Sequence, residues 1–260
     1  TREGQTRATV MPLPGERKAL FERGRERFVS EAKTLAKFGD DPSIVGVRTF
    51  FYENSTAYIV MNFVEGVTLK EFAARRGGKL PAREVLAMME PLFVSLSKVH
   101  AAGLLHRDIS PDNIMRRTNG ALILLDFGAA RQMSIAGEHS NTINVKHGFA
   151  PEEQYRTLGE QGPWTDVYAL SATIYRLTTG VTPQQALDRA MSDAPLLPPN
   201  QMGAAFSEKQ EQALLHGLAI RANQRTRSIE QLVTELKSGN YSYADQKDTE
   251  KKSISSVDEK

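Results

Sequence analysis

The sequence predicts an α+β fold, in which a small part with a β-hairpin precedes a larger, mainly helical part. Two observations predict this division. A helical pattern and two strand-like segments occupy the chain up to Val64, and helical spacings of apolar residues dominate from Pro81 onward. The 260 residues are 40% hydrophobic and 25% charged, an ordinary balance for one large domain or two smaller lobes.

The first expected element is an amphipathic helix. Apolar side chains recur at three- and four-residue spacings from Gly15 to Phe38, with Arg, Glu and Lys between them. The turn-forming run GDDPS separates this helix from Ile44–Tyr52 and Ala57–Val64, which are rich in Val, Ile, Phe and Tyr. Because only a short polar segment around Asn54 lies between these two runs, they predict a β-hairpin.

The rest of the chain is expected to be mainly helical. Apolar residues recur at helical intervals over Pro81–Ala102, where Pro91 is expected to kink the helix. Two short strands are predicted at Ile114–Met115 and Leu122–Leu125. Ser207 and Gln210 form a capping-box pattern at the start of one later helix. The later helices are predicted at about Thr165–Thr179, Pro183–Met191, Ser207–Ile220 and Ser228–Lys237.

The composition limits the classes of partner and location. A formal net charge of +2 gives no electrostatic case for nucleic acid as a partner, although the pI is about 8.7. The chain contains no cysteine, which fits a reducing compartment, and no apolar run approaches the roughly 20 residues that span a bilayer. We therefore expect no membrane segment in this chain. The expected location is cytoplasmic, which includes the cytoplasmic part of a larger membrane-anchored protein.

One pair of motifs carries a specific chemistry. Residues 106–113 read HRDISPDN, and the tripeptide DFG follows at residues 126–128. Phosphoryl transfer requires a carboxylate that orients the attacking hydroxyl, and oxygen ligands that hold magnesium on the phosphates. Asp108, Asn113 and Asp126 supply these groups, so the two motifs predict a phosphoryl-transfer site.

A third motif, APE at residues 150–152, completes an order of motifs that resembles the eukaryotic-like protein kinases. The segments ISPDN and GFAPEEQY are most similar to the bacterial serine/threonine branch, and the resemblance runs from about Arg17 to Leu236. It implies a two-lobed kinase-like fold with a mainly helical C-lobe and a truncated N-lobe made of helix C plus the hairpin. The implied boundaries are an N-terminal extension at 1–16, a partial N-lobe and hinge at 17–64 and a C-lobe at 65–237. Residues 238–260 have almost no aliphatic side chains and are rich in Lys, Asp, Glu and Ser, so their composition predicts a disordered tail or linker.

The same resemblance implies an enzyme that transfers the γ-phosphate of ATP to Ser or Thr hydroxyls of protein substrates, with ATP and Mg²⁺ as cofactors. Asp108 would orient the substrate hydroxyl, and Asn113 and Asp126 would ligate magnesium. The nucleotide would contact the gatekeeper and hinge, and one side chain beneath the adenine ring. These nucleotide-binding residues would be Met61, Asn62, Val64 and Met115.

Other positions take structural or regulatory roles by resemblance. Glu31 on helix C would pair with a lysine of the third strand, and Asp166 would anchor the backbone of the catalytic loop. Glu152 would form a buried ion pair with Arg225. A regulatory spine of packed side chains would contain Leu35, Val47, His106 and Phe127.

Arg107 points to control by phosphorylation. By resemblance, an arginine beside the catalytic aspartate marks kinases that are switched on when a phosphorylated loop residue pairs with it. Ser140 and Thr142 lie in the segment between DFG and APE and are the candidate phosphosites.

Two departures from the kinase pattern alter these expectations. No glycine-rich phosphate loop precedes Glu31, and Lys18 lies in a helical context, GERKALFERG, rather than on a strand. We therefore expect the 260 residues alone to have little or no kinase activity, because charge around the transferred phosphoryl group is missing. Ser110 stands where serine/threonine kinases place a phosphate-contacting lysine. We hypothesise that Lys146 substitutes for it; the alternative is that Lys146 is a solvated loop charge.

Two other classes of function remain open. A degenerate kinase-like module could scaffold partners without catalysis, although Asp108, Asn113 and Asp126 favour an enzyme. A small-molecule kinase of the aminoglycoside or choline type would share a similar order of acidic and amide residues. The APE motif, the activation segment and Arg107 argue against that second class.

Overall fold

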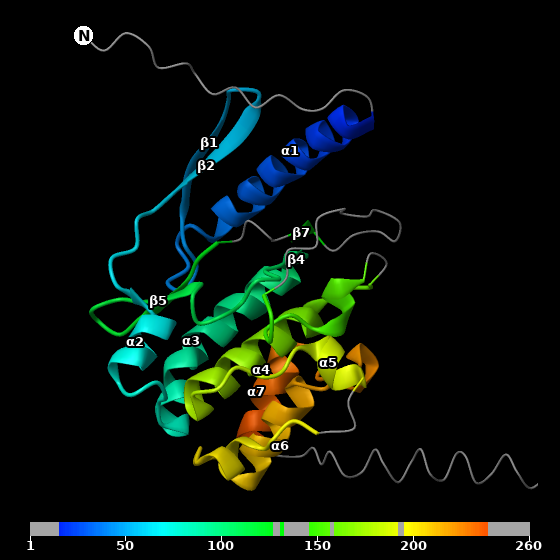
Figure 1. Ribbon diagram of the computed structural model, residues 1–260. Helices are drawn as coiled ribbons and strands as arrows, with labels where there is room; N and C mark the ends of the chain where they lie inside the picture. Colours follow the sequence, from blue (N-terminus) through cyan, green and yellow to red (C-terminus); the bar gives the residue numbers. More distant parts are fainter. Residues whose placement is uncertain (1–15, 127–130, 133–145, 157–158, 192–194, 239–260) are drawn as a thin grey trace, which may run out of the picture.

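The computed structural model describes residues 16–126, 131–132, 146–156, 159–191 and 195–238. It consists of a helical part and a second part built from one helix and one hairpin (Figure 1). This arrangement confirms the expected two-lobed α+β fold. The extension at 1–16 and the tail at 238–260 lie almost wholly outside the described residues, so these two boundaries stay predictions.

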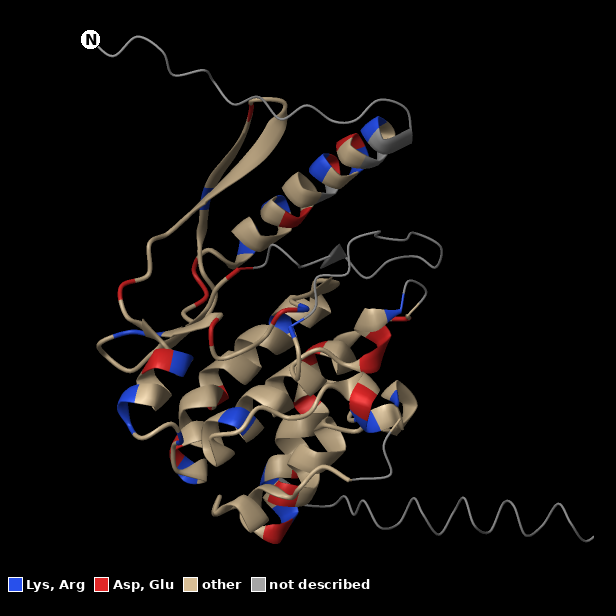
Figure 2. Cartoon of the chain, viewed as in Figure 1, with Lys and Arg blue, Asp and Glu red and all other residues tan. Residues whose placement is uncertain are grey.

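The hairpin part contains α1 (Glu16–Leu35), β1 (Val47–Glu53) and β2 (Thr56–Met61), and α1 packs against both strands. The two strands pair antiparallel, and the turn between them places Asn54 and Ser55 at φ values of 51° and 61°. Two successive residues with positive φ make the tight turn that matches the natural twist of a hairpin. The predicted helix and hairpin are thus confirmed. Charges of both signs follow the length of α1 (Figure 2).

A short connecting segment, residues 41–45 between α1 and β1, holds the hairpin part against the helical part through hydrogen bonds. The N–H of Val45 donates to the carbonyl of Leu124 at 3.1 Å, and the N–H of Leu124 donates to the carbonyl of Ser43 at 2.9 Å. On the other side of this segment, the Asp41 carboxylate accepts hydrogen bonds from Ser95 and, at 3.0 Å, from Lys98. These contacts fix the start of the hairpin on the helical part.

Two small sheets connect the helices near the lobe boundary. Strands β3 (Val67–Thr68), β5 (Ile114–Arg116) and β6 (Leu122–Leu124) form one sheet in the order β3-β5-β6, and all neighbours are antiparallel. Strand β4 (Leu104–Leu105) pairs with β7 (Arg131–Gln132). Helix α2 (Leu69–Arg75) follows β3 directly and begins at a capping box made by Thr68 and Glu71. The sequence pattern missed β3, β4 and α2 because such short elements show no full period of apolar spacing.

The helical part is built around α4 (Pro163–Thr179). This helix packs against α6 (Glu208–Gly217), α7 (Ile229–Ser238) and α3 (Ala82–Ala101), and α3 also contacts α7 (Figure 1). The helix predicted over 81–102 is confirmed and continues through Pro91. Helix α5 (Ala186–Met191) starts later than expected. Short 3₁₀ turns lie at Ala36–Phe38, Glu152–Tyr155, Pro199–Met202 and Ala222–Gln224.

Helix caps explain where the later helices begin and end. The Ser207 hydroxyl accepts from the N–H of Gln210, and the Gln210 side chain accepts from the N–H of Ser207, so the predicted capping box is confirmed. Pro163 opens α4, and Gly180 ends it at a φ of 81°, a left-handed conformation that glycine adopts without steric cost. None of the helices among the described residues is long and apolar enough to cross a bilayer.

Candidate active site

The catalytic loop is held by one buried carboxylate. Asp166, in the first turn of α4, accepts the backbone N–H of Arg107 at 2.7 Å and that of His106 at 2.8 Å. It also contacts ring Nε2 of His100 at 2.8 Å. Complete burial works to raise the pKa of Asp166, but the hydrogen bonds and charge of His100 outweigh it and keep the pKa below its ordinary value. These contacts agree with the role expected of Asp166 as an anchor of this loop.

His106 is fully buried and uses both ring nitrogens inside the protein. Its Nε2 lies 2.8 Å from the carbonyl of Leu125, and its Nδ1 accepts the N–H of Asp108 at 3.2 Å. Since Nδ1 accepts, the ring is neutral with its proton on Nε2. Burial lowers the pKa of His106 and so favours this neutral form. Both ring nitrogens of His106 therefore contact the protein interior, and its expected structural role stays a prediction.

The other predicted spine positions are only partly described. Leu35 belongs to the hydrophobic core, and Val47 is half-buried against that core. Phe127 lies outside the described residues. The complete spine of Leu35, Val47, His106 and Phe127 therefore stays a prediction.

Asp108 and Asn113 are joined inside the loop. The Asn113 amide nitrogen donates to the Asp108 carboxylate at 2.7 Å and to the Asp108 carbonyl at 2.8 Å. The amide NH₂ is thereby used, which leaves the amide oxygen of Asn113 as the group that can bind a cation. The half-buried carboxylate of Asp108 is held in one orientation, as a group that positions a substrate hydroxyl must be.

Sheet register brings Asp126 to the same place. Ile114 pairs with Leu124, and the N–H of Leu125 donates to the carbonyl of Asn113 at 2.8 Å. Asp126 follows directly and is exposed, with a φ of 53° that is uncommon for a residue other than glycine. An amide oxygen and a carboxylate from neighbouring chain segments form the donor set that Mg²⁺ prefers when phosphates complete its coordination. The residues present therefore fit magnesium.

Lys146 reaches the position where the kinase pattern lacks its lysine. Its Nζ donates to the Ser110 hydroxyl at 2.8 Å and lies 2.7 Å from a carboxylate oxygen of Asp112. The backbone around it is fixed, since the N–H groups of Phe149 and Ala150 both donate to the Lys146 carbonyl at 3.0 Å. Lys146 is thus bound to the catalytic loop at Ser110, and its substitution for the missing lysine stays a prediction.

The hinge is partly committed to internal contacts. The N–H of Asn62 donates to the carbonyl of Gly46 at 2.8 Å, and its side-chain oxygen accepts from Arg48 at 2.7 Å. A cavity of about 500 Å³ lies beside this segment and is lined by Met61, Val64 and Ile123 among others. None of the catalytic-loop residues 106–113 lines this cavity. Met115 is half-buried on β5.

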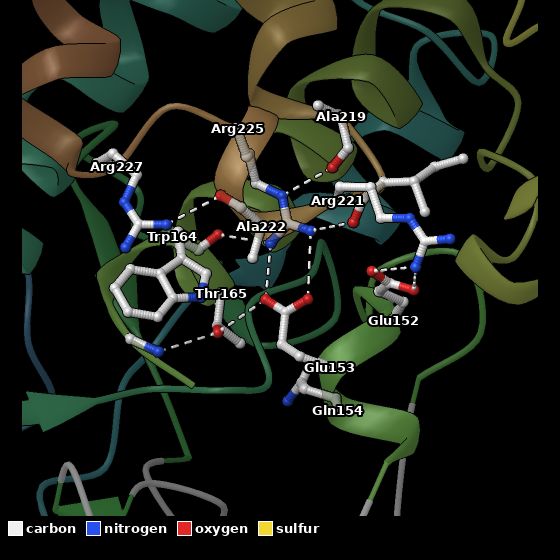
Figure 3. Close-up of polar contacts among 12 residues, drawn as sticks. Glu152, Glu153, Gln154, Trp164, Thr165, Ala219, Arg221, Ala222, Arg225 and Arg227 are labelled. Atoms are coloured by element: carbon white, nitrogen blue, oxygen red, sulfur yellow. Dashed lines mark hydrogen bonds and ion pairs between the residues drawn. The ribbon is translucent and has the colours of Figure 1, made fainter. Parts of the chain in front are cut away.

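The ion pair predicted between Glu152 and Arg225 is wrong by one residue. Arg225 donates to both carboxylate oxygens of Glu153, at 2.7 and 3.2 Å, and its side chain is completely buried (Figure 3). Glu152 contacts the exposed guanidinium groups of Arg156 and Arg221 instead, at 3.0 and 2.9 Å. Both glutamates lie in one tight 3₁₀ turn, where adjacent side chains point in different directions.

The Arg225 side chain also binds the backbone of neighbouring segments. Its guanidinium also donates to the carbonyls of Ala219, Trp164 and Ile220, at 2.8, 3.1 and 2.7 Å (Figure 3). The Thr165 hydroxyl donates to Glu153 at 3.1 Å, one residue before the anchor Asp166. The segment after APE is therefore locked to the start of α4, the helix that holds the catalytic loop.

Of the predicted regulatory residues, the structure describes Glu31 and Arg107 but not the two candidate phosphosites. Glu31 is buried on α1. Arg107 has a positive φ of 68°, and its carbonyl accepts from the Gln154 side chain at 2.8 Å. Ser140 and Thr142 lie outside the described residues, so their phosphorylation stays a prediction.

Sequence reasoning missed several residues of this site. Gln154 holds the Arg107 carbonyl, and Lys70 lies 2.8 Å from the second carboxylate oxygen of Asp112. Asp112 could have been considered, since it lies within HRDISPDN. Lys70 could not have been predicted, because no sequence pattern indicated helix α2 or its contact with the catalytic loop.

Comparison with known proteins agrees with this geometry. A family model described as "Protein kinase domain" matches residues 15–235. PknL, a serine/threonine-protein kinase of Mycobacterium tuberculosis, is 32% identical over 178 residues, which cover 68% of this chain and 44% of PknL. PrkC of Bacillus subtilis is 34% identical over 159 residues, covering 60% of this chain and 24% of PrkC. The chain spans less than half the length of these relatives.

A solved structure described as "PpkA-294 apo form" has a TM-score of 0.69 and 33% sequence identity to this chain. The match covers 86% of this chain and 79% of that chain. Serine/threonine-protein kinase F of Synechocystis is 39% identical over 153 residues, 57% of this chain and 29% of that protein. The motifs, the fold and these matches agree: the chain belongs to the protein kinase domain family, and to its bacterial serine/threonine type.

Proposed function

We propose that the protein transfers the γ-phosphate of ATP to Ser or Thr hydroxyls of protein substrates, with Mg²⁺ as cofactor. The observation that carries this proposal is the bonded arrangement of Asp108, Asn113 and Lys146 on a loop anchored by Asp166. Asn113 holds the Asp108 carboxylate, and Ser110 and Asp112 hold the Lys146 ammonium, which supports an enzyme over a scaffold without catalysis.

Each residue would have a separate task. Asp108 would orient the substrate hydroxyl and accept its proton. Asn113 and Asp126 would hold magnesium, which neutralises charge on the phosphates when bound. Lys146 would supply the positive charge near the transferred phosphoryl group that Ser110 cannot provide. Asp108 and Asn113 lie on the catalytic loop, Asp126 follows β6, which pairs with β5 beside that loop, and Lys146 contacts the loop through Ser110 and Asp112.

The adenine would lie between the hinge and β5. The backbone groups of Asn62 and Val64 that are not committed to Gly46 would bind the base, with Met61 as gatekeeper and Met115 beneath the ring. Hydrogen bonds from a hinge backbone fix the base without a charged side chain, and methionine adapts to a flat ring.

A phosphotransfer assay on the full-length protein tests this proposal. Asp108→Asn should lower kcat by about 10²- to 10⁴-fold, because the proton acceptor is lost. Lys146→Ala should lower it by about 10²-fold, because a charge that stabilises the transition state is lost. Ser110→Lys in the Lys146→Ala background should recover part of that loss by restoring a lysine on the catalytic loop. Unchanged turnover in Asp108→Asn would overturn the proposal.

Two further comparisons define the activity. Transfer to a generic protein substrate but not to choline or an aminoglycoside would support a protein kinase. The 260 residues alone should turn over slowly, because this sequence contains no glycine-rich phosphate loop. Equal, robust turnover by this chain and by one extended upstream would contradict that second expectation.

A further inference from the structure

Asp112 lies between two ammonium groups that come from distant parts of the chain. One carboxylate oxygen is 2.8 Å from Nζ of Lys70 on α2, and the other is 2.7 Å from Nζ of Lys146. The backbone supports the same approach, because the N–H of Lys70 donates to the carbonyl of Pro111 at 3.1 Å. The first turn of α2 is therefore bonded to the catalytic loop through both backbone and side chain.

This arrangement restricts a side chain that is otherwise flexible. A lysine ammonium is a point charge on a four-carbon stem, and it has three donors. In Lys146, Asp112 takes one donor and the buried Ser110 hydroxyl takes a second at 2.8 Å. One donor remains for a phosphate oxygen. Two fixed contacts therefore decide where the positive charge is placed.

The charges of the cluster also matter. If Asp112 contacted Lys146 alone, the pair would be neutral and would attract a phosphate weakly. With Lys70 present, two ammonium groups share one carboxylate, and the cluster carries a net charge of +1. That is the charge that a single lysine at position 110 would provide.

We propose that Asp112 is a positioning residue, which holds the Lys146 ammonium beside Ser110 while Lys70 shares its charge. This inference rests on the proposed role of Lys146 in phosphoryl transfer. The opposing explanation is an ordinary surface salt bridge, since such pairs are common and contribute little. The two explanations differ in whether the effect of Asp112 passes through Lys146.

A double-mutant cycle on the full-length protein separates the two explanations. The variants are Asp112→Asn, Lys146→Ala and the double variant, assayed for kcat and for the KM of ATP. Asp112→Asn keeps the size of the side chain and removes its charge. It should lower kcat by roughly 10-fold to 100-fold, as expected for a misplaced catalytic group, and leave the KM of ATP nearly unchanged. In the Lys146→Ala background it should have no further effect on kcat.

Lys70→Met tests the sharing of charge. It should lower kcat, because Asp112 would then neutralise Lys146 alone. The matched control is Lys237→Met, since Lys237 also pairs with an acidic side chain, Glu90, but on the exposed surface outside the active site. Lys237→Met should leave kcat unchanged. Thermal unfolding of each variant confirms that the fold is retained.

The outcomes distinguish a failure of the role proposed for Lys146 from a failure of the positioning role proposed for Asp112. If Lys146→Ala leaves kcat unchanged, the proposed role of Lys146 is wrong and the positioning role falls with it. If Lys146→Ala is impaired but Asp112→Asn lowers kcat equally in both backgrounds, or not at all, the positioning role alone is overturned. A Lys70→Met variant with wild-type kcat would overturn the sharing of charge.

Discussion

The helical part and the hairpin part of this kinase domain bury their side chains to different degrees. On α4, even hydroxyl side chains such as Thr173 and Thr178 are buried and donate to carbonyls of the preceding turn, both at 2.8 Å. On the hairpin, large side chains such as Tyr52 and Met61 are exposed by 55% and 42%. The catalytic loop is anchored to the helical part, through hydrogen bonds to the buried Asp166 of α4. The difference indicates that the helical part contributes more of the stability of the fold and holds the catalytic loop in place.

The largest expected effect on stability lies in the buried ion pair. Glu153→Gln should lower the free energy of unfolding by about 3–5 kcal/mol, because it leaves the buried guanidinium of Arg225 without a compensating charge. The neighbouring Glu152→Gln should cost less than about 1 kcal/mol, because the Arg156 and Arg221 side chains are 59% and 53% exposed. Urea unfolding measures both. If Glu152→Gln lowered the free energy of unfolding more than Glu153→Gln does, Glu152 would be the partner of Arg225, as the sequence predicted.

A matched pair of valines tests the contrast between the two parts directly. Val167 on α4 is fully buried, whereas Val60 on β2 is 38% exposed. Val167→Ala should cost about 2 kcal/mol through lost burial and a new cavity. Val60→Ala should cost about 0.5 kcal/mol or less. Equal losses in thermal or urea unfolding would contradict the assignment of stability to the helical part.

The smallest expected effect is a dependence of stability on acid. Burial works to raise the pKa of Glu235, but hydrogen bonds from His216 and Thr226 outweigh it and keep the pKa low. A depressed carboxyl pKa stabilises the fold above the ordinary value of about 4.3, and this stabilisation is lost as the pH falls through the lower native pKa.

Glu235→Gln should therefore flatten the acid side of the stability curve, with little change in its slope near neutral pH. Unfolding midpoints measured over a pH series check this. A slope identical to that of the wild type below about pH 4.3 would show that Glu235 does not carry the effect. The variant should retain some acid sensitivity, because the pKa of Asp166 is also held low.

The sequence predicted the elements and residues whose signals are local. Long helices such as α3 repeat their apolar spacing several times, and HRDISPDN keeps Asp108 and Asn113 close enough to contact each other. The motif HRDISPDN therefore located the catalytic loop. Lys146 was considered only because Ser110 stands where a lysine is expected, and the two side chains are in contact.

The sequence did not predict which way a side chain points, nor which segments distant along the chain come into contact. Glu152 and Glu153 are chemically identical neighbours, and only the path of a 3₁₀ turn decides which one meets Arg225. Lys70 reaches Asp112 from a seven-residue helix that apolar periodicity does not reveal. Such contacts depend on packing between segments far apart in the sequence, which single-sequence patterns do not contain.

The connecting segment between Asp41 and Val45 also has a mechanical consequence. Its bonds to Leu124 and Lys98 hold one end of the hairpin part against the helical part. Helix α1 has 20 residues and is therefore about 30 Å long. A rotation of the hairpin part by about 10° about this segment would displace the far end of α1 by about 5 Å.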